Sequence, residues 1–192
     1  SKLVARTLSR GAGDMGEKQV LEFLSDRVSS MGATSGRDQF LLSAKYPSRF
    51  SGDILGLMKK VLTEPHFDEV EVQKSIREQV AAIRSSEDQP VNLAYRNLFP
   101  FLFKEHSYGY FHTGLPDELP EYTAEDLKKF WAEQQDKPWV LAVCGQFDRE
   151  EIMELAKILD QDPGSLDDGE PRWGDEREMT LTMADRNQTH LM

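Results

Sequence analysis

Three prolines divide the first half of this 192-residue chain into segments that each carry one periodic pattern. Apolar residues recur at helical spacing over residues 51–63, between Pro47 and Pro65. They recur in the same way over residues 68–86, between Pro65 and Pro90. Proline cannot continue a helix, because it lacks the amide N–H and clashes with the preceding turn. The pattern therefore predicts separate amphipathic helices that must bury one face each.

Capping residues predict helices before these segments as well. Residues 2–8 have a helical pattern, which Gly11 interrupts. Asp14 followed by Glu17 matches a capping box, in which each side chain satisfies a free backbone amide at the start of a helix. The helix that opens there is predicted to end at Gly32. Its apolar stripe consists of Val20, Leu24, Val28 and Met31.

The second half of the chain carries similar helix signals. Helices are predicted over residues 90–98, 123–134 and 148–159. Proline fits the first turn of a helix, and threonine and aspartate are favoured caps. The residues that mark the helix starts are Pro90, Thr123 and the pair Asp148 and Glu151.

Period-two alternation predicts strands at three places. The longest is Ala33–Tyr46, where Phe40 and Leu42 share one face while Leu41 and Ser43 share the other. Trp139–Cys144 is a short apolar strand pattern, and Met179, Leu181 and Met183 alternate with polar residues. Few strands among many helices predict an α+β fold, a two-layer sandwich in which a mostly antiparallel sheet is backed by helices.

Composition excludes several classes of function. The chain is 39% hydrophobic, so it can form an ordinary core. Its net charge of −11 would repel phosphate backbones, so nucleic acid is not an expected partner. It would instead mildly attract basic peptides. No stretch approaches the ~20 consecutive apolar residues of a membrane-spanning helix.

The chain has a single cysteine, Cys144, so neither an internal disulfide nor a cysteine-based zinc cluster can form. It follows the apolar run 139–143, which predicts a buried, unreactive thiol. Nucleophilic chemistry by serine has no support either, because no G-x-S-x-G element is present.

Six segments of this chain resemble segments of the pitrilysin/insulinase family, which includes the mitochondrial processing peptidases. They occur in the same order as in that family and cover nearly the whole chain. The resemblance implies a processing-peptidase-like fold. The segments are Arg10–Ala12 with the helix after it up to Ser30–Ala33, Ser35–Gln39, Glu64–Glu69 with Ile83–Pro90, His106–Gly109 with Gly114 and Leu115, Val140–Gly145 with Asp148, and Asn187–His190.

Active members of this family carry H-x-x-E-H on their first helix, just before the turn that Arg10–Ala12 resembles. The two histidines bind zinc, and the glutamate activates the attacking water. By the resemblance, the two ligand positions hold Lys2 and Arg6 here, and the position of the base holds Ala5. Two cations at the ligand positions would repel a divalent metal, so we expect no zinc at this place.

The third zinc ligand of the family is a distal glutamate, and the resemblance assigns its position to Ala82. The separation between Arg6 and Ala82 matches the spacing in active members. An accessory carboxylate of the family corresponds to Ser75. The register of the motif is therefore kept, whereas all of its ligands are missing.

The resemblance implies an explanation for this loss. Family members pair a catalytic half with a homologous inactive half, and the two halves close around a peptide. The chain is then a non-catalytic segment that forms part of the peptide-binding chamber of a zinc metalloendopeptidase. It would be inactive alone, hold no cofactor itself, and dock on a zinc-bearing catalytic half, in the same chain or in a separate subunit.

Two other functions remain open at this stage. The chain could belong to a non-proteolytic scaffold or assembly subunit derived from the same family. An H-x-x-E-H motif in the parent chain or in a partner would favour the peptidase, and its absence from both would favour the scaffold. The third alternative is a stand-alone acidic module that binds peptides.

Histidines and aromatic residues offer the remaining candidate sites. His106 and His112, with Glu105 beside them, are the rival metal ligands, although a structural role is expected. His66 is predicted to be a local hydrogen-bond partner. Several aromatic residues near the middle of the chain could contact a peptide, and the alternative is that they pack under a loop. This group consists of Tyr108, Tyr110 and Phe111.

Domain organisation follows from the same patterns. Residues 1–160 are predicted to form one domain of the family, whose first strands would lie upstream. The acidic segment 161–175 reads as a linker because it is rich in proline and glycine. Residues 176–192 would be the opening strands of a following domain. The compartment is not constrained: both the bacterial cytoplasm and the periplasm fit.

Overall fold

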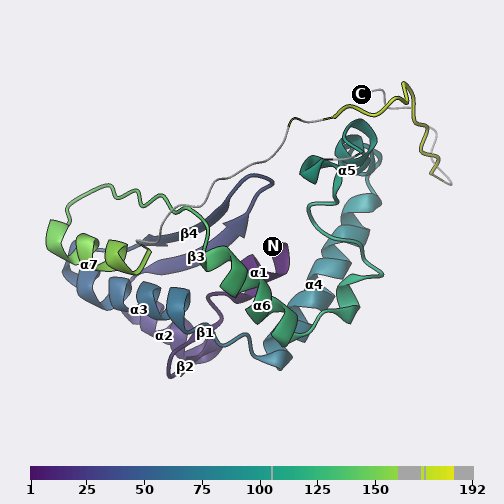
Figure 1. The fold of residues 1–192 in the computed structure, drawn as a ribbon. Helices are drawn as coiled ribbons and strands as arrows, with labels where there is room; N and C mark the ends of the chain where they lie inside the picture. The colour runs from purple at the N-terminus through teal and green to yellow at the C-terminus, as the bar shows by residue number, and fades with distance from the viewer. Residues whose placement is uncertain (105, 160–169, 171, 184–192) are drawn as a thin grey trace. The chain divides into compact units, whose positions relative to one another are not determined.

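The computed structural model describes residues 1–104, 106–159, 170 and 172–183. Helices dominate it, with two small antiparallel sheets (Figure 1). Its helices are α1 (Lys2–Thr7), α2 (Glu17–Asp26), α3 (Ser51–Thr63), α4 (Glu69–Glu87), α5 (Pro90–Leu102), α6 (Ala124–Gln135) and α7 (Arg149–Leu159). Its strands are β1 (Gly11–Ala12), β2 (Met15–Gly16), β3 (Ser30–Ser35) and β4 (Phe40–Lys45). Its short 3₁₀ turns are η1 (Ser48–Phe50), η2 (Ser107–Gly109) and η3 (Leu119–Glu121).

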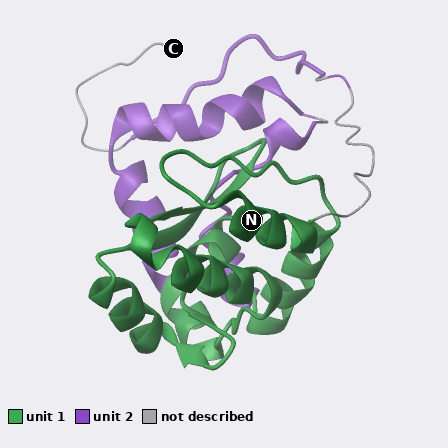
Figure 2. Cartoon of the chain, turned by 90° about the vertical axis from the view of Figure 1, so that its left-hand side faces the viewer, with its two compact units in different colours: residues 1–75, 122–165 green, residues 76–121, 166–192 purple. Residues whose placement is uncertain are grey.

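The chain divides into two compact units, and the division falls inside α4 (Figure 2). Unit 1 comprises residues 1–75 and 122–165, and unit 2 comprises residues 76–121 and 166–192. The predicted division into 1–160, 161–175 and 176–192 stays a prediction, since most of the linker and residues 184–192 lie outside the described residues. Residues 176–183 are described and form no strand, contrary to the alternation of their methionines and leucine.

The predicted strand over residues 33–46 is a hairpin. Its first strand, β3, begins earlier than predicted and pairs antiparallel with β4, from Ser30 opposite Lys45 to Ser35 opposite Phe40. The amide of Gly36 closes the turn by donating to the carbonyl of Gln39 at 2.8 Å. The alternation within β4 is confirmed, because Leu41, Ser43 and Lys45 are exposed and the residues between them are half-buried.

The predicted two-layer sandwich is not observed in the described part of the chain. The strands form two separate two-stranded sheets, β1–β2 and β3–β4, and no larger sheet. The coarser prediction, a mixed fold of helices and antiparallel strands, is confirmed.

Most helix boundaries follow the local signals, but α5 continues past the predicted end at residue 98 to Leu102, with Pro100 inside it, and α2 differs more. Its N-cap is Gly16, whose amide bonds to the side chain of Gln19 at 2.9 Å, so the predicted box of Asp14 and Glu17 is wrong. The helix also ends at Asp26, well before Gly32. The amide of Ser29 bonds to the carbonyl of Leu24 and that of Val28 to Ser25, which is the Schellman arrangement that ends helices.

Val28 takes the position of this motif that glycine normally fills. Its φ is 50°, in the left-handed region that a β-branched residue adopts at a cost. Val28 is 78% exposed, so it does not belong to the buried apolar stripe that was predicted for this helix. Met31 lies in β3 instead of the helix. Because no glycine marks this end of α2, the sequence pattern predicted a helix that is too long.

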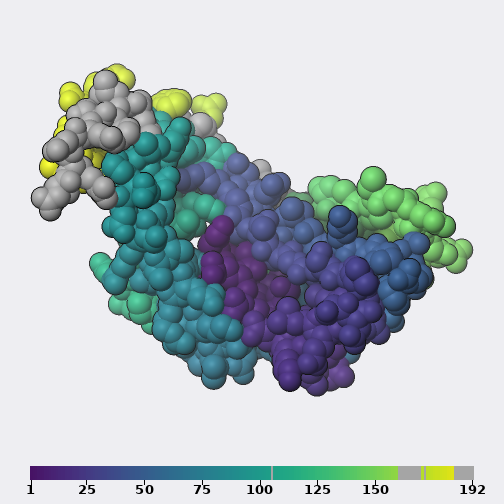
Figure 3. All heavy atoms as spheres, turned by 180° about the vertical axis from the view of Figure 1, so that it is seen from behind, coloured from purple at the N-terminus to yellow at the C-terminus, as the bar shows by residue number. Residues whose placement is uncertain are grey.

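The core of unit 1 lies around α1. Leu3, Val4, Ala5, Thr7 and Leu8 are all buried, so most of this short helix is surrounded by other residues. In the space-filling view, the atoms from α1 to α3 form one continuous surface, coloured purple to blue (Figure 3). Further core positions come from several elements: Ala12, Val20, Ile54, Val61 and Val72 are almost completely buried.

Trp131 of α6 joins three elements of unit 1. Its indole N–H donates to the carbonyl of Leu62 at 3.0 Å, and the side chain of Gln135 donates to the same oxygen at 2.6 Å. Leu62 lies in the last turn of α3, where backbone carbonyls lack partners within the helix. The ring also packs against Phe40 of β4, with 5.4 Å between centroids.

The predicted strand Trp139–Cys144 does not form within the described structure. Trp139 packs edge-on against Trp131, but Val140 is 93% exposed. Cys144 is exposed, so the prediction of a buried thiol is wrong. An apolar alternating segment becomes a strand only when a neighbouring strand pairs with it, and no described residue does so here.

Across the part of the chain that the structure describes, no helix combines the length and the apolar character that crossing a membrane requires.

The conformation of Val28 leads to a prediction. Replacing Val28 by asparagine, which tolerates the left-handed region, should raise the free energy of unfolding by about 1 kcal/mol. Denaturant unfolding followed by circular dichroism measures it. Leu21→Asn is the control, because Leu21 is also exposed on α2 but has an ordinary helical position. It should be neutral or destabilising. An equal gain in both variants would contradict the explanation by backbone strain.

Candidate functional site

The window in which the family carries its zinc ligands lies on α1. Ala5, at the position of the catalytic base, is buried with 4% of its surface exposed. Lys2 and Arg6, one helical turn apart, are half-buried. Their separation of four residues places both cations on the same side of the helix. This side of α1 therefore presents positive charge where the resemblance implies metal ligands.

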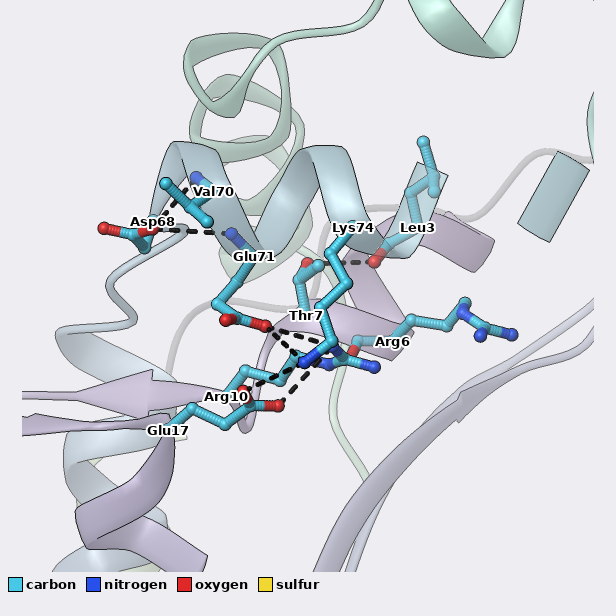
Figure 4. A network of polar contacts seen from close by, with 9 residues as sticks. All are labelled: Leu3, Arg6, Thr7, Arg10, Glu17, Asp68, Val70, Glu71 and Lys74. Atoms are coloured by element: carbon cyan, nitrogen blue, oxygen red, sulfur yellow. Dashed lines mark hydrogen bonds and ion pairs between the residues drawn. The ribbon is translucent and has the colours of Figure 1, made fainter. Parts of the chain in front are cut away.

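Next to this window, four charged side chains from three parts of unit 1 form a network of ion pairs (Figure 4). Arg10, which follows α1, lies 3.4 Å from Glu17 of α2 and 3.1 Å from Glu71 of α4. Lys74 of α4 lies 3.4 Å from Glu17 and 3.3 Å from Glu71. Each carboxylate is thus paired with both cations, and the formal charges of the network cancel.

Arg6 contributes its backbone to this network. Its carbonyl accepts a hydrogen bond from Nε of Arg10 at 3.0 Å, which fixes the guanidinium of Arg10 between the two glutamates. The guanidinium of Arg6 itself points away from the network (Figure 4). The carboxylates of Glu17 and Glu71 therefore form ion pairs with Arg10 and Lys74.

The network changes the protonation of its members. Burial favours the neutral form of the Glu71 carboxyl, but the hydrogen bonds that Lys74 and Arg10 donate to it outweigh burial and lower its pKa. The pKa of Lys74 is raised, first by its hydrogen bond to Glu71 and then by that to Glu17. Both shifts favour the charged forms, which are the forms that attract one another.

Ser75 and Ala82, the other positions implied by the resemblance, both lie on α4. Ser75 belongs to unit 1 and is completely buried, and its hydroxyl has no hydrogen-bond partner within the described structure. Ala82 belongs to unit 2 and is exposed. Neither side chain offers the carboxylate that a zinc site would need at these positions.

The rival metal ligands have other surroundings. Nδ1 of His106 accepts a hydrogen bond from the amide of Tyr108 at 3.2 Å, and its ring lies 6.2 Å from that of Phe103. His112 is half-buried, and Glu105 lies outside the described residues. Within the described chain, no three residues of the histidine, cysteine, aspartate and glutamate types gather as a metal site would require.

His66 is a hydrogen-bond partner as predicted, but its partners are distant in the sequence instead of local. Its Nε2 lies 2.6 Å from the carbonyl of Gly13, and its backbone amide donates to the carbonyl of Gly11 at 3.0 Å. A Cβ at Gly11 would lie 2.8 Å from Nδ1 of His66, so the contact requires glycine there. These bonds attach the turn before α4 to the β1–β2 hairpin of unit 1.

The three aromatic candidates for peptide contact have different surroundings within unit 2. Tyr108 packs edge-on against Phe103, with 5.6 Å between centroids. Phe111 lies under the guanidinium of Arg96, 4.7 Å from its ring centroid. Tyr110 is 77% exposed. Tyr110 therefore presents the largest accessible surface for a ligand, and the other two rings contribute to packing.

Arg96 is an important residue that the sequence patterns did not reveal. From α5, it lies 2.7 Å from Glu87 and donates to the carbonyl of Gly114 at 2.8 Å and to the hydroxyl of Thr113. Only 11% of its side chain is exposed. Because the amide of Gln79 also donates to the carbonyl of Thr113 at 2.7 Å, the loop before η3 is held by side chains from two helices.

The shifted pKa of Glu71 predicts how stability depends on pH. A lowered pKa means that the stabilisation is complete above the ordinary value of 4.5 and is lost as the pH falls below it. Glu71→Gln should reduce stability at pH 7 by about 1 kcal/mol and make the loss between pH 7 and roughly pH 3.5 smaller than in the wild type. Urea midpoints at both pH values measure this. Glu22→Gln, which affects only the exposed pair with Lys18, should leave the pH dependence unchanged.

The environment of Arg96 predicts a loss of stability on truncation. Arg96→Met keeps the apolar stem but removes every polar contact, so unfolding should become easier by about 1–3 kcal/mol. The matched control is Arg84→Met, since Arg84 is 68% exposed and its nearest carboxylate, Asp117, is 3.9 Å away. Thermal unfolding of both variants gives the comparison. Equal melting temperatures would show that Arg96 does not hold the loop.

Comparison with solved structures places the fold. The chain superposes on the peptidase M16 inactive domain from Pseudomonas fluorescens with a TM-score of 0.77 and 19% identity, over 89% of this chain and 43% of that one. It matches a protease from Helicobacter pylori with a TM-score of 0.67 and 16% identity, over 88% and 42%. A conserved protein from Enterococcus faecalis V583 matches with a TM-score of 0.65 and 14% identity, over 84% and 43%.

Searches by sequence give no corresponding match: neither a protein-family model nor a curated protein matches the chain. The chain spans less than half the length of the solved proteins that it resembles. The predicted resemblance is thus confirmed at the level of the fold: this chain has the fold of part of a peptidase M16 inactive domain.

Proposed function

We propose that this chain is a non-catalytic segment of a zinc metalloendopeptidase of the pitrilysin/insulinase type and forms part of its peptide-binding chamber. The observation that carries the proposal is the side of α1 that presents Lys2 and Arg6 on an M16 inactive-domain fold. The chain covers 43% of the first of these solved proteins. Cleavage would then require a catalytic half, in the same polypeptide or in a separate subunit.

The residues of the window do not fit a zinc ion. Zinc in proteins is bound by histidine, cysteine or carboxylate groups. Lysine and arginine are cationic at neutral pH and offer no lone pair to a metal. The carboxylates close to them, Glu17 and Glu71, are held by Arg10 and Lys74 in ion pairs. The chain itself would therefore take no metal at this place, and the zinc of the parent enzyme would belong to the catalytic half.

The overall charge supports a role next to peptides. With a net charge of −11, the chain raises the local concentration of basic peptides and repels acidic ones. Tyr110, which is 77% exposed in unit 2, offers an apolar and hydrogen-bonding surface to such a ligand.

The assignment of the window can be tested by restoring ligands. Wild-type protein dialysed against zinc buffer should contain far less than one equivalent by elemental analysis. Lys2→His/Arg6→His places two histidines four residues apart on one helix, a known two-ligand spacing, and should bind roughly one equivalent of zinc. Lys2→Gln/Arg6→Gln is the control for loss of charge and should bind none. Tight zinc in the wild type, or no gain in the histidine variant, would contradict the assignment.

A scaffold subunit derived from the same fold is the alternative function. Binding of fluorescent peptides separates the two: a chamber segment should bind a lysine- and arginine-rich peptide, with an affinity that falls as salt rises, and an acidic peptide far more weakly. Absence of binding to either peptide would favour the scaffold.

A further inference from the structure

Unit 2 contains an aromatic cluster that is closed by the chain's own C-terminal segment. Phe103, at the end of α5, is buried, with only 8% of its surface exposed. Its ring lies 5.8 Å from Phe99, 5.6 Å from Tyr108 and 6.2 Å from His106. On a further side it is covered by Trp173, at 4.8 Å between centroids. The ring that closes the cluster thus comes from a segment 70 positions further along the chain.

The segment around Trp173 is attached by contacts of three kinds: backbone, ring and ion-pair contacts. Trp173 bridges to Phe103 through the backbone, and the amide of Gly174 donates to the carbonyl of Leu102 at 2.8 Å. Glu176 pairs with Lys104 at 2.7 Å, with both side chains about half exposed. Residues 173–176, called the strap below, are therefore held by an aromatic contact, a backbone bond and a surface ion pair.

These contacts are individually weak. Exposed ion pairs, single backbone hydrogen bonds and aromatic pairs each stabilise a folded state only modestly. Trp173 remains 68% exposed, so one face of its ring is covered and the rest meets water. A structural tryptophan of a core would be buried far more completely. The strap is therefore held against the end of α5 by weak contacts and remains largely exposed, as a bound peptide ligand would be.

We infer that the end of α5 is a binding site for a short peptide of the pattern aromatic–glycine–any–acidic, and that residues 173–176 occupy it as an internal competitor. The aromatic side chain would stack on Phe103, and the acidic side chain would pair with Lys104. Glycine is required between them because a Cβ at Gly174 would lie 3.0 Å from the carbonyl of Phe101 and 3.4 Å from Lys104. The proposal does not depend on the proposed function, because all of its contacts lie within unit 2.

Because the strap belongs to the same chain, it competes strongly with a free peptide for the site at the end of α5. A tethered segment is present at an effective concentration in the millimolar range, so a free peptide of equal affinity cannot displace it at lower concentration. The site is thus closed in the resting protein. It opens to a ligand that binds more tightly than the strap, or when the strap is drawn away by another interaction.

The test uses the 192-residue chain and a fluorescein-labelled peptide with the sequence of residues 172–177, Arg-Trp-Gly-Asp-Glu-Arg. Trp173→Ala/Glu176→Gln removes the two side-chain anchors, which are largely exposed, so folding should be preserved and is checked by circular dichroism. Fluorescence anisotropy should show binding to this variant at least tenfold tighter than to the wild type. A peptide with alanine in place of its glycine is the matched control and should bind at least fivefold more weakly.

Charge reversal locates the site. In the strap-removed protein, Lys104→Glu should abolish binding of the labelled peptide, and a peptide with lysine at the position of its glutamate should restore binding. Equal binding to the wild type and the strap-removed variant, or binding unaffected by Lys104→Glu, would overturn the proposal. So would a wild-type dimer that Trp173→Ala dissociates, because the occupant would then be the strap of a second copy.

Discussion

Unit 1 depends on the burial of α1, a helix too short to be stable without tertiary contacts. Nearly every apolar residue of Lys2–Thr7 is removed from water, and Leu8 after it is fully buried. The hydrophobic effect therefore holds the helix at the centre of the unit. Lys2 and Arg6 are left half-buried on one side, and the chain continues at once into the arginine that pairs with α2 and α4.

The network beside α1 joins three parts of unit 1 through side-chain contacts. In a zinc site, carboxylates and histidines are held together by the ion. Here Glu17 and Glu71 are held together by Arg10 and Lys74, so like charges near the window are compensated by side chains of the same chain. The ion pairs therefore connect the segment after α1 with α2 and α4.

Unit 2 is stabilised in a different way, because a long irregular loop follows α5. Backbone groups of such a loop must find partners, and side chains supply them. Arg96 and Gln79 bind carbonyls of Thr113 and Gly114, while Phe103 gathers the rings around the end of the helix. Gly109 permits the chain to pass the carbonyl of Phe103, because a Cβ there would lie only 1.7 Å from that oxygen.

The sequence by itself determined the elements whose signals are local. Pro90, Thr123 and Asp148 mark the starts of α5, α6 and α7. Proline fits the first turn of a helix, and the side chains of Thr123 and Asp148 accept from amides only three and two residues away. The resemblance in the order of its segments also predicted the likeness to the M16 inactive-domain fold, but not that the strands form two separate small sheets. Tertiary structure decided the rest: α2 ends at a left-handed valine, residues 139–144 remain unpaired, and Arg10 meets Glu71 across 61 positions. Strand pairing and ion pairs depend on what lies opposite, and no local pattern records residues that only the folded chain brings together.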